Sequence, residues 1–191
     1  MQDEEKGREC NMKMELVDPV DWGSVIEQID IEFGTGVTKR LLGNRVPVAM
    51  TKGSTKLFYA IPTDWMKKFS DISESLDVHF IGKELGSIEK GRFRLSLHIL
   101  DEMVEVTESF IIVSRQGAEA FTYGRSLIKE SVLQLNKSLV RGQRVIVLNE
   151  NRECLGIAVL SVDASKLGRL ATDKLVAKNL VDIGWFIRRL G

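Results

Sequence analysis

The last third of the chain, residues 118–191, consists of short apolar runs separated by glycines and polar turns. Three of these runs have the length of β-strands: 144–148, 155–162 and 175–181. The polar residues 150–153 lie between the first two runs, as the turn of a hairpin does. Short strands with glycine at their bends are typical of a small barrel-like sheet. We therefore expect a small mixed β pseudo-barrel here, with a helix over residues 126–135.

Charge is distributed unevenly along the chain. The sequence has 27 Lys and Arg residues and 27 Asp and Glu residues, so its net charge is zero. Residues 118–191 contain 12 basic and 7 acidic side chains, whereas residues 1–117 contain 15 and 20. The zero is therefore a balance of +5 against −5. Such an asymmetry is typical of a protein with an anion-binding module, and RNA is the anion that we expect.

The length of 191 residues and the 43% hydrophobic content allow either one ordinary domain or two small ones, and the charge shift favours two. No apolar stretch approaches the roughly 20 residues that span a bilayer, and residues 1–14 are charged. We therefore expect a cytoplasmic protein without a signal peptide or membrane contact. Cys10 and Cys154 have no second thiol or histidine at ligand spacing, so we expect no disulfide, no metal and no cofactor.

The N-terminal half has the pattern of an α+β domain. Residues 1–15 are charged, lack periodicity and are predicted to form a flexible tail. Asp18 can cap a helix that begins with Pro19 and ends at Gly34. Apolar side chains recur at helical spacing along this segment: Trp22, Val25, Ile26, Ile29 and Phe33. The helix therefore has one buried face.

A second helix is predicted over residues 65–76, and strands are predicted at 45–50, 56–61, 78–81, 92–100 and 110–113. The first two strands flank a loop that contains Gly53, as in a hairpin. Alternation in the fourth strand places Arg92, Arg94 and His98 on one face, a basic stripe that would extend an RNA path or contact a protein partner. Residues 16–117 are thus predicted to be an antiparallel sheet with flanking helices.

Motifs of catalysis are not found in the sequence. Gly82-Lys83 lacks the upstream glycine and the following Ser or Thr of a P-loop, and residues 34–36 lack the third glycine of a dinucleotide fingerprint. The two histidines, His79 and His98, have no nucleophile or acid at motif spacing. We therefore expect a protein without an active site.

An ordered set of short motifs resembles a known family. In the C-terminal third the motifs are Gly117-Ala118-Glu119, Phe121-Thr122-Tyr123-Gly124, Leu127-Ile128-Lys129, Leu155-Gly156, and Asp182-Ile183-Gly184 with Arg188 downstream. Upstream they are Lys56-Leu57-Phe58-Tyr59, the segment 66–72, Ile81-Gly82-Lys83 and the segment 90–98. Together they resemble the ribosome-biogenesis factor family called nuclear import protein seven after its eukaryotic members, which acts in large-subunit rRNA maturation.

The resemblance implies a pre-PUA α+β domain at residues 16–117 and a PUA RNA-binding domain at residues 118–191, in an archaeal member of the family. It implies binding to pre-rRNA with a preference for unpaired, uridine-rich segments. It also implies contact with other ribosome-assembly or RNA-processing proteins. Two positions depart from the family pattern: Trp185 follows the Asp-Ile-Gly triplet where an acidic residue is common, and Ala158 stands where a second glycine is expected.

Eight basic side chains are expected to bind RNA. Four lie within 13 residues around Gly168, and the others belong to segments that adjoin it in the PUA fold, as the resemblance implies: Lys166, Arg169, Lys174, Lys178, Arg125, Lys129, Arg188 and Arg189. Clustered cations neutralise phosphates and release counterions. The alternative for each of them is a solvated surface position. Tyr123 and Trp185 are candidates to stack an unpaired base, and core packing is the alternative for Tyr123.

Two other functions fit the same domain layout. PUA domains are also appended to pseudouridine synthases and transglycosylases, so an accessory subunit or relative of an RNA-modifying enzyme is one alternative. Residues 1–117 offer no Asp or Cys motif of the kind that such enzymes need. Translation initiation factors of the density-regulated or malignant T-cell-amplified type share the layout as well. The matches at residues 90–98 and 121–124 favour the ribosome-biogenesis family.

Overall fold

The computed structural model describes residues 13–68, 81–185 and 188 of the chain. The chain divides into two compact units, one of Met1–Val25 and Leu42–His98 and the other of Ile26–Leu41 and Ile99–Gly191. Each unit contains one sheet, and the fold is α+β as the sequence predicts. The domain boundary expected at residue 117 stays a prediction. The two units are defined by contacts between residues, and such contacts do not show which segment folds by itself.

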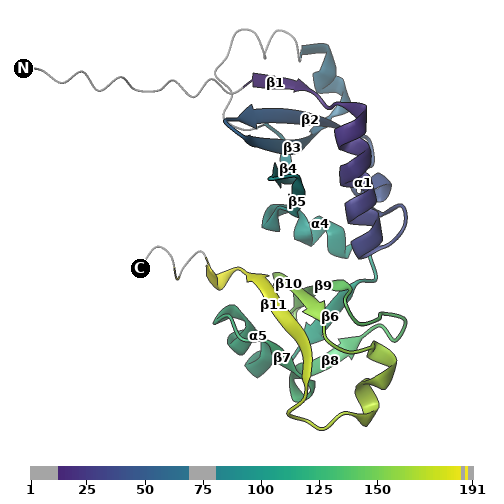
Figure 1. The fold of residues 1–191 in the computed structure, drawn as a ribbon, viewed down its shortest axis with the longest axis vertical. Coiled ribbons are helices and arrows are strands. Elements are labelled where there is room, and N and C mark those ends of the chain that lie inside the picture. The colour runs from purple at the N-terminus through teal and green to yellow at the C-terminus, as the bar shows by residue number, and fades with distance from the viewer. Residues whose placement is uncertain (1–12, 69–80, 186–187, 189–191) are drawn as a thin grey trace, which may run out of the picture. The chain divides into compact units, whose positions relative to one another are not determined.

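The first unit contains a five-stranded antiparallel sheet in the order β1-β2-β3-β4-β5 (Figure 1). The strands are β1 Lys13–Leu16, β2 Arg45–Lys52, β3 Thr55–Pro62, β4 Lys83–Glu89 and β5 Arg92–Leu95. Strand β1 begins within the segment that the sequence predicts as a tail, and residues 1–12 lie outside the described residues. The sheet therefore uses residues on both sides of the first helix.

The hairpin of β2 and β3 forms as predicted. Its register runs from Arg45 opposite Pro62 to Lys52 opposite Thr55. Gly53 turns the chain with a φ of 60°, a conformation that suits glycine. The middle of the hairpin is buried on both faces because apolar side chains cover each of them. Phe58 packs on one face against Trp22 and Phe93, with ring centroids 6.3 and 6.1 Å apart.

The strand expected over residues 92–100 is shorter in the structure. Strand β5 ends at Leu95, and the chain continues as the 3-10 turn η2 (Leu97–Ile99) and helix α4 (Leu100–Val104). Ile99 and Met103, four residues apart, are both 0% exposed. The apolar residues at the end of the predicted strand are therefore buried with the periodicity of a helix. Arg92 and Arg94 are exposed on β5, but His98 belongs to η2.

A few predicted elements fall partly outside the described residues. The helix predicted over residues 65–76 and the strand predicted over 78–81 lie largely in the segment 69–80, which the structure does not describe. Before that segment, a 3-10 turn, η1, covers Thr63–Trp65. Within the described ranges, no helix combines the length and the apolar character that crossing a membrane requires.

Helix α1 (Pro19–Phe33) begins and ends where the sequence predicts. The carboxylate of Asp18 accepts hydrogen bonds from the backbone N–H groups of Val20 and Asp21 at 2.8 and 3.2 Å, which caps the helix. Gly34 follows the last turn with a φ of 114°. The short helix α2 (Val37–Leu42) comes next. The predicted apolar face is confirmed, since Val25, Ile29 and Phe33 are buried.

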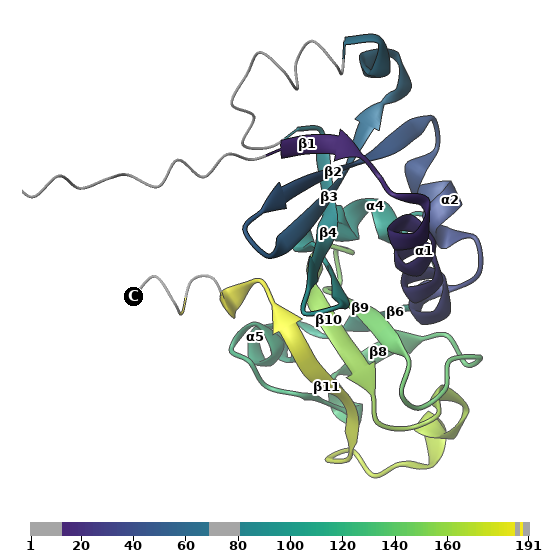
Figure 2. The same ribbon diagram turned by 45° about the horizontal axis from the view of Figure 1, so that its top comes forward.

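The second unit contains a six-stranded sheet in the order β7-β11-β10-β9-β6-β8 (Figure 2). Its strands are β6 Phe110–Val113, β7 Leu127–Ile128, β8 Val132–Leu135, β9 Arg144–Leu148, β10 Cys154–Leu160 and β11 Leu175–Asp182. Only β6 and β9 are parallel; the other pairs are antiparallel. The end strands β7 and β8 follow one another in sequence, so the sheet curls back on itself into the predicted pseudo-barrel.

The helix predicted over residues 126–135 is wrong, because this segment forms β7, the 3-10 turn η3 (Lys129–Ser131) and β8. Its backbone donors pair with a distant segment instead of with its own carbonyls. The N–H of Lys129 donates to the carbonyl of Lys174 at 2.9 Å, and the N–H of Glu130 donates to that of Thr172 at 3.0 Å. Long-range pairing thus overrides the local helical tendency.

Helix α5 (Arg115–Thr122) packs against the pseudo-barrel at a close approach. Ser114 caps the helix by accepting a hydrogen bond from the N–H of Gly117 at 3.2 Å. A Cβ at Gly117 would lie 2.7 Å from the Cβ of Ser131, so only glycine fits without displacement. One turn later Phe121, 0% exposed, enters the core. Gly117 and Phe121 therefore define the buried face of α5.

This close approach yields a stability prediction. We expect Gly117→Ala to destabilise the protein by a net 1 to 2 kcal/mol, roughly, because the overlap with Ser131 outweighs the gain in helix propensity. Gly23→Ala is the matched control, since a Cβ there meets nothing within 4 Å and Gly23 lies in helix α1. The control should stabilise the protein by about 1 kcal/mol. Denaturant unfolding followed by circular dichroism measures both, and equal effects would contradict the packing argument.

Candidate nucleic-acid interface

The C-terminal end of α5 has the hydrogen bonds of a Schellman motif. The N–H of Gly124 donates to the carbonyl of Phe121 at 2.9 Å, and the N–H of Arg125 donates to that of Ala120 at 3.0 Å. Gly124 has a φ of 85°, which glycine adopts without strain. The turn holds Arg125 against the helix end and leaves Tyr123 69% exposed. Tyr123 is therefore a surface residue, and core packing is excluded for it.

A buried carboxylate joins strand β11 to the C-terminal turn. The side chain of Asp182 is 3% exposed, and Arg188 Nη2 donates to its Oδ1 and Oδ2 at 3.1 and 3.0 Å. Arg188 Nη1 also donates to the carbonyl of Thr122 at the end of α5. Asn179 Nδ2 donates to Asp182 Oδ2 at 3.1 Å and to the carbonyl of Phe121 at 2.9 Å. This Asp182 network anchors β11 and the C-terminal turn to α5.

The network explains the triplet Asp182-Ile183-Gly184. A Cβ at Gly184 would overlap the carbonyl oxygen of Thr122, so the chain can pass the helix end only with glycine at this position. Asp182 supplies the buried carboxylate, and Ile183 is 43% exposed between them. The triplet is thus a packing motif, which the sequence alone does not reveal.

Three of the eight expected RNA-binding residues have partners within the protein. Arg188 holds the Asp182 network, and Lys129 Nζ donates to the carbonyl of Leu170 at 2.9 Å. Lys166 is exposed but forms an ion pair with Asp163 at 2.7 Å. The hydrogen bond from Lys166, together with one from the backbone N–H of Arg141, holds the pKa of Asp163 below its ordinary value. Arg189 lies outside the described residues.

The remaining four expected residues are exposed: Arg125, Arg169, Lys174 and Lys178. Arg125 lies next to β11, because Ser126 Oγ accepts a hydrogen bond from the backbone N–H of Asn179 at 3.4 Å. Lys178 is the neighbouring residue on that strand. Arg169 ends the 3-10 segment η4 (Ala164–Arg169), and Lys174 directly precedes β11. Strand β11 therefore connects two groups of cations, one beside α5 and one beside η4. Their role in RNA binding stays a prediction.

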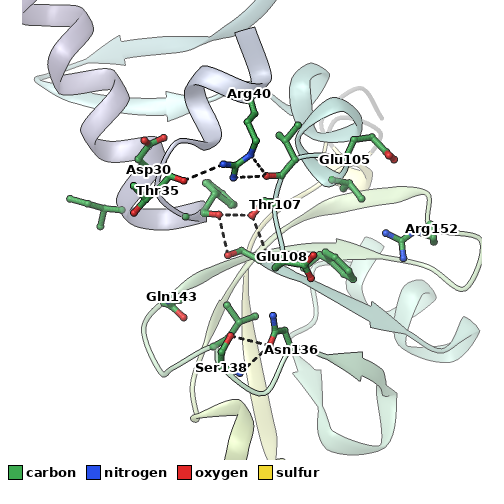
Figure 3. Close-up of a pocket in the computed structure, with 18 residues that line it drawn as sticks. Asp30, Thr35, Arg40, Glu105, Thr107, Glu108, Asn136, Ser138, Gln143 and Arg152 are labelled. Atoms are coloured by element: carbon green, nitrogen blue, oxygen red, sulfur yellow. Dashed lines mark hydrogen bonds between the residues drawn. The ribbon is translucent and has the colours of Figure 1, made fainter. Parts of the chain in front are cut away.

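A cavity of about 1110 Å³ also lies in the second unit, and none of the eight expected RNA-binding residues lines it (Figure 3). Arg40 is engaged there, since its Nε and Nη2 donate to the carbonyl of Val106 at 3.3 and 3.0 Å. The guanidinium carbon Cζ of Arg152 lies 4.9 Å from the centroid of the Phe110 ring, over its face. The acidic residues that line the cavity are Asp30, Glu105 and Glu108. Because both arginines are occupied and the carboxylates repel phosphate, this cavity is a poor site for RNA.

The cysteine and histidine side chains are groups of this chain that could act as a nucleophile or a base. Cys154 begins β10 and is half-buried. Burial, together with a hydrogen bond and charge from Asp101, raises the pKa of its thiol to about 12, so it stays protonated and a weak nucleophile at neutral pH. Among the described residues, no three His, Cys, Asp or Glu side chains gather as metal ligands. His79 and Cys10 lie outside the described residues.

The nearly closed mixed pseudo-barrel with β7 and β8 at its edges, and with α5 packed against it, defines a protein with a C-terminal PUA-type domain. The solved structure of a conserved PUA domain protein from Thermoplasma acidophilum has the same fold, with a TM-score of 0.59 and 12% identity; the match covers 94% of this chain and 100% of that one. In sequence, residues 109–191 match the family model described as the UPF0113 PUA domain.

Two relatives extend the match beyond this domain. A UPF0113 protein of Archaeoglobus fulgidus is 27% identical over 137 residues, which cover 72% of this chain and 75% of the relative. The 60S ribosome subunit biogenesis protein nip7 of Schizosaccharomyces pombe is 28% identical over 97 residues, 51% of this chain and 54% of the yeast protein. Residues 109–191 thus match the UPF0113 PUA domain, and the chain is similar to UPF0113 proteins and to nip7, which bears out the family resemblance seen in the sequence.

Removing the cation of the Asp182 network should cost stability. We expect Arg188→Ala to destabilise the protein by about 3 kcal/mol or more, because it leaves a buried carboxylate without its charged partner. Arg125→Ala is the control for loss of an exposed arginine and should stay within about 0.5 kcal/mol. Thermal and urea unfolding measure both. Equal stability of the two variants would show that the Asp182 network does not anchor the C-terminal turn.

The hydrogen bonds of Asp30 make part of the stability depend on pH. Burial raises the pKa of Asp30, but hydrogen bonds from the backbone and side chain of Thr38 and from the N–H of Gly36, with the charge of Arg40, lower it more. The net pKa lies below 3.8, the ordinary value. A lowered folded-state pKa gives stability that is present above the unfolded-state pKa and is lost as pH falls through the folded-state pKa.

We therefore expect Asp30→Asn to lower the unfolding free energy at pH 7 by about 1 kcal/mol, the difference between charged and neutral hydrogen bonds. The deficit relative to the unmodified protein should shrink once pH falls below about 4. Urea unfolding at several pH values measures it. A deficit that is the same at pH 7 and pH 3 would show that the charge of Asp30 contributes nothing.

Proposed function

We propose that this protein is a non-catalytic RNA-binding protein that acts in biogenesis of the large ribosomal subunit. The observation that supports it most directly is the set of exposed cations on and beside β11, within a domain that matches the UPF0113 PUA model. The relationship to a yeast protein named for 60S subunit biogenesis supports the ribosomal context. The ligand is pre-rRNA, bound at single-stranded, uridine-rich segments. Partners would include other ribosome-assembly or RNA-processing proteins, and the site of action would be the cytoplasm.

The arrangement of charge supports a single-stranded ligand. Strand β11 has eight residues and is about 26 Å long at 3.3 Å per residue, which is long enough to follow several nucleotides of an extended strand. Exposed cations lie before the strand and near its middle: Lys174 precedes it, and Lys178 and Arg125 lie about halfway along it. Their attraction to phosphates is independent of sequence and is weakened by salt. In this proposal residues 118–191 contain the RNA-binding domain, and residues 16–117 the pre-PUA domain.

Simultaneous change of Lys166, Arg169, Lys174 and Lys178 to Ala tests this interface. We expect affinity for oligouridine to fall by an order of magnitude or more. The slope of log affinity against log salt should become shallower by up to about 0.7 for each lost phosphate contact. Fluorescence anisotropy across a salt series measures both quantities. Circular dichroism should show little loss of stability, because these side chains are exposed.

The matched control changes Lys39, Lys52, Lys67 and Lys68 to Ala, which removes the same number of charges from exposed positions in the N-terminal half, outside the Arg92, Arg94 and His98 stripe. Affinity should change little in this variant. Equal losses in both variants would mean that net charge alone attracts RNA. No loss in either variant, or no binding by the unmodified protein near physiological salt, would contradict the proposed interface.

A further inference from the structure

A second hollow, of about 550 Å³, lies on the exposed side of α5. Five residues line it: Gln116, Glu119, Ala120, Tyr123 and Arg125. The first four recur at spacings of three and four along one face of the helix, opposite the buried Gly117 and Phe121. The small side chain of Ala120 leaves room between its longer neighbours. The hollow is therefore a product of the helical repeat, and it adjoins the cation group beside α5, with which it shares Arg125.

The backbone around the hollow is firmly held. The Schellman hydrogen bond from the N–H of Arg125 to the carbonyl of Ala120 fixes the loop against the helix. The N–H of Tyr123 and the hydroxyl of Thr122 both donate to the carbonyl of Glu119, at 3.2 and 3.0 Å. Packing of Phe121 secures the opposite side. A ligand would thus meet lining residues whose backbone positions are already set, which limits the entropic cost of binding.

The lining combines three kinds of chemistry. Tyr123, 69% exposed, offers an aromatic face on which a base can stack. Glu119 offers a carboxylate, which only accepts hydrogen bonds when ionised, while Arg125 only donates. Within the described part of the chain, the side chains of Glu119 and Arg125 form no ion pair with each other or with another residue. These groups are therefore available to a ligand with a flat ring, N–H donors and a nearby anion.

We propose that this hollow binds one unpaired guanine of the RNA strand and that Glu119 determines the choice of base. The proposal rests on the RNA-binding function proposed above. Guanine alone among the four RNA bases presents two adjacent N–H donors, N1–H and N2–H, on its Watson–Crick edge, and these match the two oxygens of a carboxylate. Uracil presents a single N–H between two carbonyl oxygens, which a carboxylate repels. Tyr123 stacks the base, and Arg125 contacts the adjoining phosphate.

The test compares the full-length protein binding to a ten-nucleotide oligouridine and to the same strand with one central guanosine. We expect the guanosine strand to bind about tenfold more tightly, the lower range for a bidentate base contact. In Glu119→Gln this preference should disappear while affinity for oligouridine is kept. Glu130→Gln is the control, since it removes one exposed carboxylate from the same domain outside the hollow. The control should keep the preference.

Binding of guanosine and uridine 5′-monophosphates, measured by saturation-transfer NMR, separates this proposal from the general one. Oligouridine binding without a guanosine preference, or a preference that Glu119→Gln retains, would overturn the guanine site and leave the proposed function standing. Failure to bind either strand would contradict the proposed function. In that case selective saturation of guanosine monophosphate, lost in Glu119→Gln, would still support the guanine site, and equal or no saturation would overturn it.

Discussion

The buried carboxylate of Asp182 is the group on which the geometry around α5 and β11 depends. A carboxylate that is 3% exposed is costly unless it is paired and hydrogen-bonded, and both oxygens here accept from Arg188 while one also accepts from Asn179. The same two donors reach the carbonyls of Phe121 and Thr122, which the last turn of a helix cannot satisfy itself. One network thus satisfies the polar groups of a strand, a helix end and the C-terminal turn.

The Asp182 network shows that the basic residues of the C-terminal third do not all have the same role. Arg188 and Lys129 have structural partners, so their charge is partly committed to folding. Arg125, Lys178, Lys174 and Arg169 are exposed and retain their attraction for an anion. The net charge of +5 in residues 118–191 therefore overstates the charge available for binding. For binding an extended anion, the position of these cations along β11 matters more than the net charge.

The sequence predicts those elements whose signals are local. The capped helix from Pro19 to Phe33 and the hairpin around Gly53 have their turn residues, caps and apolar periodicity within one segment. Residues 126–135 do not, because their backbone pairs with distant segments, namely strand β11, strand β6 and the residues Thr172 and Lys174, and no local sequence pattern predicts that pairing. The site follows the same rule. Clustered lysines are visible in the sequence, but the pairing of Arg188 with a buried Asp182 and the hollow beside Ala120 require the folded chain.

The motifs that reveal the family are mostly motifs of packing. Gly184 is needed because the Thr122 carbonyl approaches closely, Gly124 because the Schellman turn requires a positive φ, and Gly117 because Ser131 lies against the helix. None of these constraints concerns a ligand. The exposed face of α5, in contrast, is free of them, so its side chains can change without disturbing the fold. In the proposed RNA-binding function, discrimination among targets would reside in residues such as Glu119 and Tyr123, which the scaffold holds in place but does not itself require.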